Sequence, residues 1–348
     1  MKHQALVAGL MAGDRTRAAD GPHLTPEFLQ ATLLFVERYA RIEKMVLGGT
    51  RVSYSKAALG MNLSPGGDVL QQGEQLADSE RTRFGLATGP ILELGWLIED
   101  QGVKIIPRRF PAGAAAHGGF FFDSELGPCI LVNADAIAVH RDYMIVHQYG
   151  HFLADYDPYI TTLCGHPNPV LLDDPRELRA HQFALSFLMP RRDMETYRTA
   201  LALADKPLTA EFVRQLRIYF AVDTEMVFWR LLSLGWIEPP RIESLLRQNE
   251  DLLAPVKVDR MDTDERLVIL GAIPERLVHL VASAFGRGFV ELEDAASYLE
   301  TDIEETKHVL EQFRFAADEG GAAPGSGAAT SRRAAAPRRS TPPRPSPN

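Results

Sequence analysis

The chain has 348 residues, of which 45% are hydrophobic and 24% are charged, and this composition is typical of a globular protein with a sizeable core. Its formal net charge of -9 argues against a protein that binds nucleic acid through a broadly basic surface. Two cysteines, Cys129 and Cys164, are too few for a disulfide framework, and no apolar run approaches the roughly 20 residues that cross a bilayer. We therefore expect a cytoplasmic protein.

Helical periodicity in the N-terminal part begins at residue 26. Residues 26–47 combine a proline at a first helical position with apolar side chains at helical spacing. Residues 48–73 are rich in Gly, Ser, Asn and Gln, which indicates an irregular connection. Helical patterns follow over residues 74–84 and 90–101. Residues 1–25 show no comparable pattern, and we expect them to be poorly ordered.

Short apolar runs that are typical of strands replace the helical pattern after residue 102. The candidate strands cover residues 103–106, 119–122 and 129–133. The connections between them contain Pro111-Ala112-Gly113 and Glu125-Leu126-Gly127-Pro128, which are typical of turns. The sequence therefore predicts a small antiparallel sheet just ahead of the next helix.

That next helix, expected over residues 136–154, carries the segment His147-Gln148-Tyr149-Gly150-His151. Two histidines four residues apart lie about one turn apart on one helix face, so both imidazoles can bind one metal ion. In the zinc-peptidase pattern H-E-x-x-H, the glutamate accepts a proton from the zinc-bound water. Gln148 stands at that position, and an amide cannot accept a proton near neutral pH. The alternative is a helix whose histidines satisfy polar groups of the core.

A zinc site that keeps one position for water needs a third protein ligand. Glu177, at the start of a helix expected over residues 175–189, is the best candidate, although an acidic residue there also stabilises the helix dipole. His181 lies one turn further along the same face and would either support a ligand or compete with it. In the loop over residues 155–174, Cys164 would occupy the open zinc position as a latch, or it is a half-buried loop cysteine.

Two aspartates, Asp155 and Asp157, follow the motif helix in the same loop. Either of them would be near enough along the chain to approach a bound metal. Carboxylates are also common at helix ends and in turns, and we favour that interpretation for both.

The rest of the sequence predicts helices followed by a tail of low complexity. Residues 210–220 and 224–234 have the outline of a helix-turn-helix. The second of these helices has only one basic residue, Arg230, among large aromatic residues, which is typical of a core rather than of a DNA-reading surface. Between Glu291 and Glu311 the only basic residue besides histidine is Lys307, so a protein partner is favoured there over a phosphate backbone. The predicted helices cover residues 210–220, 224–234, 265–270, 274–285, 292–299 and 304–313.

The histidine motif and the segment that starts at Glu177 together resemble the ImmA/IrrE family of metallopeptidases. That family carries H-E-x-G-H, followed by E-x-x-A-x-x-F-A-x-x-L-L-M-P. The residues that match at unchanged spacing are Glu177, Ala180, Phe183, Ala184, Leu188, Met189 and Pro190. The run Gly127-Pro128-Cys129-Ile130-Leu131-Val132-Asn133 is similar to the strand that precedes the motif helix in the family. The resemblance covers about residues 90–235.

The resemblance implies an α+β fold with a zincin-like core, in which ligand-bearing helices pack against a small antiparallel sheet. From periodicity and composition we expect an all-helical C-terminal region and a disordered tail to follow this core. It implies that His147, His151 and Glu177 bind Zn2+. It also implies a regulator that acts on a helix-turn-helix transcriptional repressor of a stress response or mobile element. We expect segments 1–25, 26–89, 90–200, 201–316 and 317–348, of which 90–200 is the metallopeptidase domain.

Gln148 and His181 depart from the family pattern, which has glutamate and more often a small polar residue at these positions. Loss of a general base typically costs about 10²–10⁴ in rate, so we expect peptidase activity to be weakened or lost. The alternative is a catalytically inactive interaction or sensor module that retains the fold. Many family members also carry an N-terminal DNA-binding helix-turn-helix, for which the segment ahead of Pro26 leaves no room. We therefore expect no sequence-specific DNA binding by this chain.

Overall fold

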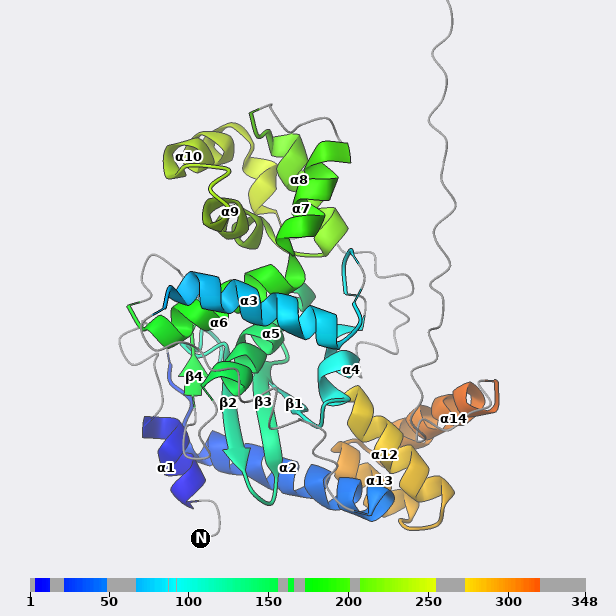
Figure 1. The fold of residues 1–348 in the computed structure, drawn as a ribbon. Coiled ribbons are helices and arrows are strands. Elements are labelled where there is room, and N and C mark those ends of the chain that lie inside the picture. The colour runs from blue at the N-terminus through cyan, green and yellow to red at the C-terminus, as the bar shows by residue number, and fades with distance from the viewer. Residues whose placement is uncertain are drawn as a thin grey trace, which may run out of the picture.

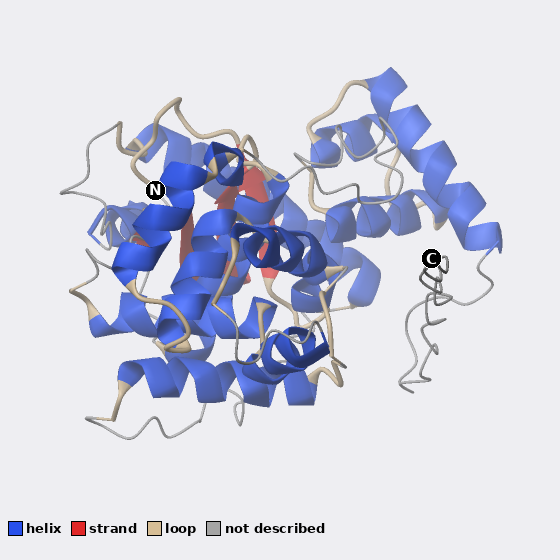
Figure 2. Ribbon diagram, turned by 90° about the horizontal axis from the view of Figure 1, so that it is seen from above, coloured by secondary structure: helices blue, strands red, loops and turns tan. Residues whose placement is uncertain are grey.

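The computed structural model shows a small β-sheet enclosed by helices, with further helices at both ends (Figures 1 and 2). It describes residues 4–12, 22–48, 67–86, 88–91, 93–155, 162–165, 173–200, 207–254 and 273–319. The helix expected over 265–270 and the tail beyond 319 lie outside the described residues. Among the described helices, none combines the length and the apolar character that are needed to span a bilayer.

The α+β fold class expected from the sequence is confirmed. The elements, in chain order, are α1 (Gln4–Ala12), α2 (Pro26–Leu47), α3 (Val69–Arg83), α4 (Leu94–Glu99), β1 (Lys104–Arg108), β2 (Gly118–Asp123), β3 (Gly127–Asn133), α5 (Ala138–Ala154), β4 (Thr162–Cys164), α6 (Pro175–Leu188), α7 (Arg191–Ala200), α8 (Ala210–Phe220), α9 (Thr224–Ser233), α10 (Pro239–Gln248), the 3-10 turn η2 (Glu250–Leu253), α12 (Glu275–Gly286), α13 (Leu292–Leu299) and α14 (Ile303–Glu319). The helices over 26–47, 210–220 and 292–299 begin and end where the sequence predicts them.

The sheet is mixed, whereas the sequence predicts an antiparallel one. Its strand order is β1-β3-β2-β4, and β1 pairs with β3 in parallel while the other pairs are antiparallel. Asp123 accepts hydrogen bonds from the backbone of Glu125 and Leu126, and this tight turn makes β2 and β3 a hairpin. The longer connection between β1 and β2 lets β1 pair on the far side of β3, where it runs in the same direction as β3.

The sheet separates two apolar cores because successive strand residues point to opposite faces. On one face, Phe120 and Ile130 pack with α3, α5, α6, α8 and α9. On the other face, Phe121 and Leu131 pack with α1, α2 and α12–α14. In Figure 1, α2 accordingly runs along the sheet opposite to the group of α3, α5 and α6.

The N-terminal segment is more regular than the sequence suggests. Gln4–Ala12 form α1, although we expect residues 1–25 to be poorly ordered. Leu10 is fully buried in the core shared with α2, and this contact stabilises a helix that would be too short to persist alone. Helix α3 also begins earlier than predicted, because Asp68 caps its first turn by accepting a hydrogen bond from Leu70 N.

A buried group of charges joins α2 to the sheet and to the C-terminal helices. Glu43 of α2 and Lys104 of β1 are both fully buried, and Lys104 Nζ lies 2.7 Å from Glu43 Oε2. Arg276 of α12 lies 2.5 Å from the other oxygen of this carboxylate. Lys104 also donates a hydrogen bond to the Leu126 carbonyl. The two cations neutralise one buried anion, which alone would be costly to keep in an apolar core.

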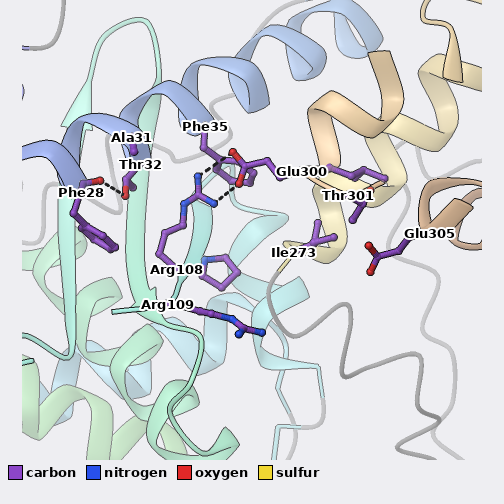
Figure 3. A pocket seen from close by; sticks show the side chains of 12 residues that line it. Phe28, Ala31, Thr32, Phe35, Arg108, Arg109, Ile273, Glu300, Thr301 and Glu305 are labelled. Carbon is purple, nitrogen blue, oxygen red and sulfur yellow. Dashed lines mark hydrogen bonds and ion pairs between the residues drawn. The ribbon is translucent and has the colours of Figure 1, made fainter. Parts of the chain in front are cut away.

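A second set of ion pairs lies nearer the surface. Glu300 follows α13 with a φ of 57°, a left-handed conformation that non-glycine residues rarely adopt. Its carboxylate pairs with Arg38 of α2 and with Arg108 at the end of β1. Figure 3 shows the pair with Arg108. Beside these pairs lies a cavity of about 680 Å³, whose lining includes Phe28 and Ile273. The ion pairs thus hold the C-terminal helices against α2 and the end of β1.

The buried charges yield a prediction about stability. Lys104→Met should lower the free energy of unfolding by about 3–5 kcal/mol, because it leaves Glu43 with less than its full set of buried partners. Lys307→Met removes a lysine that pairs with Glu304 on the surface, and we expect it to change stability little. Urea unfolding followed by circular dichroism measures both. Equal effects of the two substitutions would contradict a stabilising role for the buried group.

Candidate metal centre

Four side chains with metal-binding atoms meet on the face of the sheet that is covered by α5 and α6. They are His147 and His151 of α5, Cys164 of β4 and Glu177 of α6, and all four are buried. One donor atom from each lies within 4.8 Å of the donor atoms of the other three. Within the described part of the chain, this is the single group of His, Cys, Asp and Glu that could hold a metal ion.

The three residues that the family resemblance implies as zinc ligands lie closest together. His147 Nε2 is 3.2 Å from His151 Nε2 and 3.1 Å from Glu177 Oε2. His151 Nε2 is 3.2 Å from Glu177 Oε1. The spacing of the two histidines along α5 therefore has the geometric result that the sequence predicts, and α6 brings Glu177 to both.

Helices α5 and α6 cross closely because α5 has a glycine, Gly150, at the point of contact. A Cβ atom on Gly150 would lie 2.8 Å from the ring of Phe183 and 3.4 Å from the Cα atom of Ala180. Glycine between the two histidines therefore lets the backbone of α5 approach α6 closely. At the start of α6, Asp174 caps the helix and Pro175 occupies its first turn, which places Glu177 at the positive end of the helix dipole.

Asp155 supports His151 from behind. The Asp155 carboxylate lies 2.8 Å from His151 Nδ1 and accepts a further hydrogen bond from Arg179. This contact at Nδ1 directs Nε2 of His151 toward the other donors, and metal-binding histidines commonly have such a partner behind the ring. The sequence favours Asp155 as a helix-end carboxylate, and its i, i+4 spacing from His151 was the available signal for this contact. Asp157 lies outside the described residues.

The charges of the group favour the anionic forms of its two acids. Burial opposes ionisation of Glu177, but the charge of His151 and hydrogen bonds with both histidines hold the pKa of this carboxyl far below its usual value. Burial and Glu177 also oppose ionisation of Cys164, yet His151 and His147 lower the pKa of the thiol. Thiolate and carboxylate are the forms that bind metal ions.

Gln148 is fully buried beside the centre. Its Oε1 atom accepts a hydrogen bond from the Thr162 hydroxyl at 3.4 Å, whereas its Nε2 atom has no hydrogen-bond partner among the described residues. A buried amide nitrogen without a partner costs roughly 1–3 kcal/mol. The residue at the position of the usual general base is thus enclosed next to the candidate ligands but cannot accept a proton.

His181 does not join the four donors. Its Nδ1 atom lies 2.6 Å from the Tyr143 hydroxyl, and its ring packs edge-on against Trp229 of α9. Burial and the charge of Glu177 raise the pKa of Tyr143 well above its usual value, so this hydroxyl stays protonated beside His181. Since the Tyr143 ring also contacts His147, the pair packs beside a candidate ligand. His181 therefore lies one residue removed from His147, through Tyr143, and is not one of the four donors.

Part of the chain matches a known protein family. Residues 98–231 match the family model described as IrrE N-terminal-like domain, and this range contains all four donor residues together with Gln148. A search of curated proteins found none that matches the chain.

The helix crossing can be tested by a single methyl group. Gly150→Ala should lower the free energy of unfolding by about 1–3 kcal/mol and weaken metal binding, because the added Cβ forces Phe183 and α6 away from α5. Gly286→Ala in α12 is the matched control, since a Cβ there meets no atom within 4 Å. Urea unfolding and a competitive zinc titration measure the two effects. Equal behaviour of the two variants would show that the close crossing is unimportant.

Proposed function

Because residues 98–231 of this chain match the family model described as IrrE N-terminal-like domain, we propose that the protein is a zinc-binding regulator that acts on a helix-turn-helix transcriptional repressor. The proposal rests on one observation, that donor atoms of His147, His151 and Glu177 meet at one point. Gln148 occupies the position at which the H-E-x-x-H pattern has its general base. Metal binding is retained in this proposal, and peptide hydrolysis is weakened or lost.

The donor atoms support zinc among the common metal ions. Two imidazole nitrogens and a carboxylate oxygen are a set that catalytic zinc sites use, whereas Mg2+ and Ca2+ prefer oxygen ligands alone. Zinc bound there would act as a Lewis acid and lower the pKa of a bound water. His147, His151 and Glu177 would hold the ion, and Asp155 would fix the ring of His151.

The surroundings of Gln148 support a loss of hydrolysis. Among the described residues, two carboxylates lie close to the histidines, and both already make hydrogen bonds or ion pairs. Glu177 contacts both imidazoles, and Asp155 is bound by His151 and Arg179. Neither carboxylate is left free to take a proton from an attacking water, so the base that Gln148 lacks is not replaced by a neighbour.

The helices after the metal centre favour a protein partner over DNA. In the pair α8 and α9, Arg230 is fully buried and donates hydrogen bonds to the Met189 carbonyl and to Glu74. The basic residue of the second helix is therefore used inside the protein. Trp229 of the same helix packs against His181. A helix that faces the core in this way cannot present a recognition surface to the major groove.

A catalytically inactive sensor or interaction module is the second candidate function, and Gln148 favours it. It differs from the first in requiring no cleavage of the partner at all. Both candidates require the zincin-like core, and they separate only when binding and cleavage of a repressor are measured together.

Metal content tests the first half of the proposal. We expect the purified protein to hold about one zinc ion per chain, because its buried donors fit one ion. His147→Ala should reduce the bound zinc strongly, whereas His279→Ala on the exposed face of α12 should not. Elemental analysis after dialysis measures both. Substoichiometric metal that His147→Ala does not lower further would contradict the zinc site.

Incubation with a repressor tests the second half. The probe is a purified helix-turn-helix transcriptional repressor, taken from the gene neighbourhood of this protein where one is encoded there. We expect the wild-type protein to form a complex with it in size-exclusion chromatography and to leave it intact on gels to the same extent as His147→Ala, since loss of a base costs about 10²–10⁴ in rate. Cleavage by the wild type that His147→Ala abolishes would instead mean that another group serves as the base. Failure to form the complex would reject this repressor as the partner.

A further inference from the structure

We propose that Cys164 is a fourth protein ligand of the metal, so that the centre is a closed site of two nitrogens, one oxygen and one sulfur. This inference rests on the metal binding of the proposed function and goes beyond the three ligands that the family pattern supplies. The thiol lies 3.4 Å from Glu177 Oε1 and 3.7 Å from His151 Nε2. Cys164 is the residue that completes the group of four buried donors.

The separations fit the edges of a tetrahedron around one zinc ion. With Zn–N and Zn–O bonds near 2.0–2.1 Å and a Zn–S bond near 2.3 Å, tetrahedral geometry places nitrogen and oxygen donors about 3.3 Å from one another and sulfur about 3.6 Å from each. The observed distances among His147, His151 and Glu177 are 3.1–3.2 Å. The distances from Cys164 Sγ to Glu177 Oε1 and to His151 Nε2 are 3.4 and 3.7 Å, which is longer, as the longer Zn–S bond requires.

The backbone of Cys164 is held in place independently of any metal. Cys164 ends β4, where it pairs with Gly118 of β2, and its carbonyl accepts a hydrogen bond from His117 N at 2.8 Å. A Cβ on Gly119 would lie 2.7 Å from the Thr162 carbonyl oxygen, so glycine there allows β4 to lie close against β2. The thiol therefore projects from a strand of the sheet and does not depend on a loop to reach the histidines.

The second cysteine provides an internal comparison. Cys129 of β3 is also fully buried, but its sulfur lies near the Gly127 carbonyl and in the core on the opposite face of the sheet. Burial raises the pKa of Cys129 to about 12, which is the behaviour of an inert core cysteine. The same chain thus contains one cysteine in an apolar core and one that faces three other metal-binding groups.

A closed site changes what the centre can do. Zinc sites that catalyse hydrolysis keep one position for water or substrate, whereas sites with four protein ligands are structural. If Cys164 fills the fourth position, a water molecule can bind the metal only after the thiolate leaves. Two features then prevent activation of a metal-bound water. Gln148 cannot act as a base, and the sulfur of Cys164 occupies the position that the water would need.

Cobalt substitution tests this ligand set without reference to activity. The full-length protein is stripped of metal and loaded with Co2+, and its absorption spectrum is recorded. A cysteine ligand produces an intense near-ultraviolet charge-transfer band from thiolate to Co2+. We expect this band in the wild type and in Cys129→Ser, and its loss in Cys164→Ser. Zinc affinity should fall in Cys164→Ser by more than the roughly 10–100-fold that loss of a partner behind a ligand costs.

The outcomes distinguish this inference from the proposed function on which it rests. One cobalt ion per chain without the charge-transfer band, or a band that survives in Cys164→Ser, would overturn the cysteine ligand and leave the three-ligand zinc site intact. Failure of the wild type to bind either metal would overturn both. Far-ultraviolet circular dichroism of each variant shows whether it is folded, and Cys164→Ala provides a second variant should serine itself bind the metal.

Discussion

The close crossing of α5 and α6 is the constraint on which the metal centre depends. Two histidines on one helix face supply only half of a site, and the other donors must come from elements that are distant in the sequence. Gly150 lies between the histidines and lets Phe183 of α6 pack directly against the α5 backbone. The register that this contact sets brings Glu177, which precedes Phe183 on the same helix, to the level of the imidazoles. Packing thus determines ligand geometry.

The sheet keeps this centre separate from a second polar group. The metal-binding side chains lie on the face that packs with α5 and α6, whereas Glu43, Lys104 and Arg276 lie buried among the helices of the other face. Each group brings opposite charges together locally, since Lys104 and Arg276 face Glu43 in the latter and the imidazoles face Glu177 in the former. The C-terminal helices are therefore tied to the sheet through α2 and β1, on the side away from the centre.

The sequence predicts those features that arise from local periodicity and misses those that arise from long-range pairing. Apolar spacing locates α2 and α8 to the residue, and i, i+4 spacing places both histidines on one face. The parallel pairing of β1 with β3 follows from chain crossing, which no local pattern encodes. Strand β4 is only three residues long within a polar segment, so the sequence leaves Cys164 in a loop. Spacing alone does not distinguish Glu177 as a ligand from an acidic residue that stabilises the start of a helix, and the family resemblance favours the ligand role.

The composition of the centre bears on why a metal ion is expected where a base is missing. The centre buries two imidazoles, a carboxylate and a thiol whose donor atoms lie 3.1–3.7 Å apart. Without a bound cation, burying these groups would lower the stability of the fold. Apolar residues of similar volume would stabilise such a core more. Gln148, in contrast, is close to glutamate in shape and removes only the ability to accept a proton. Gln148 thus removes the proton acceptor while the four donor side chains stay together, which supports the proposal that a metal ion is bound here without activating water.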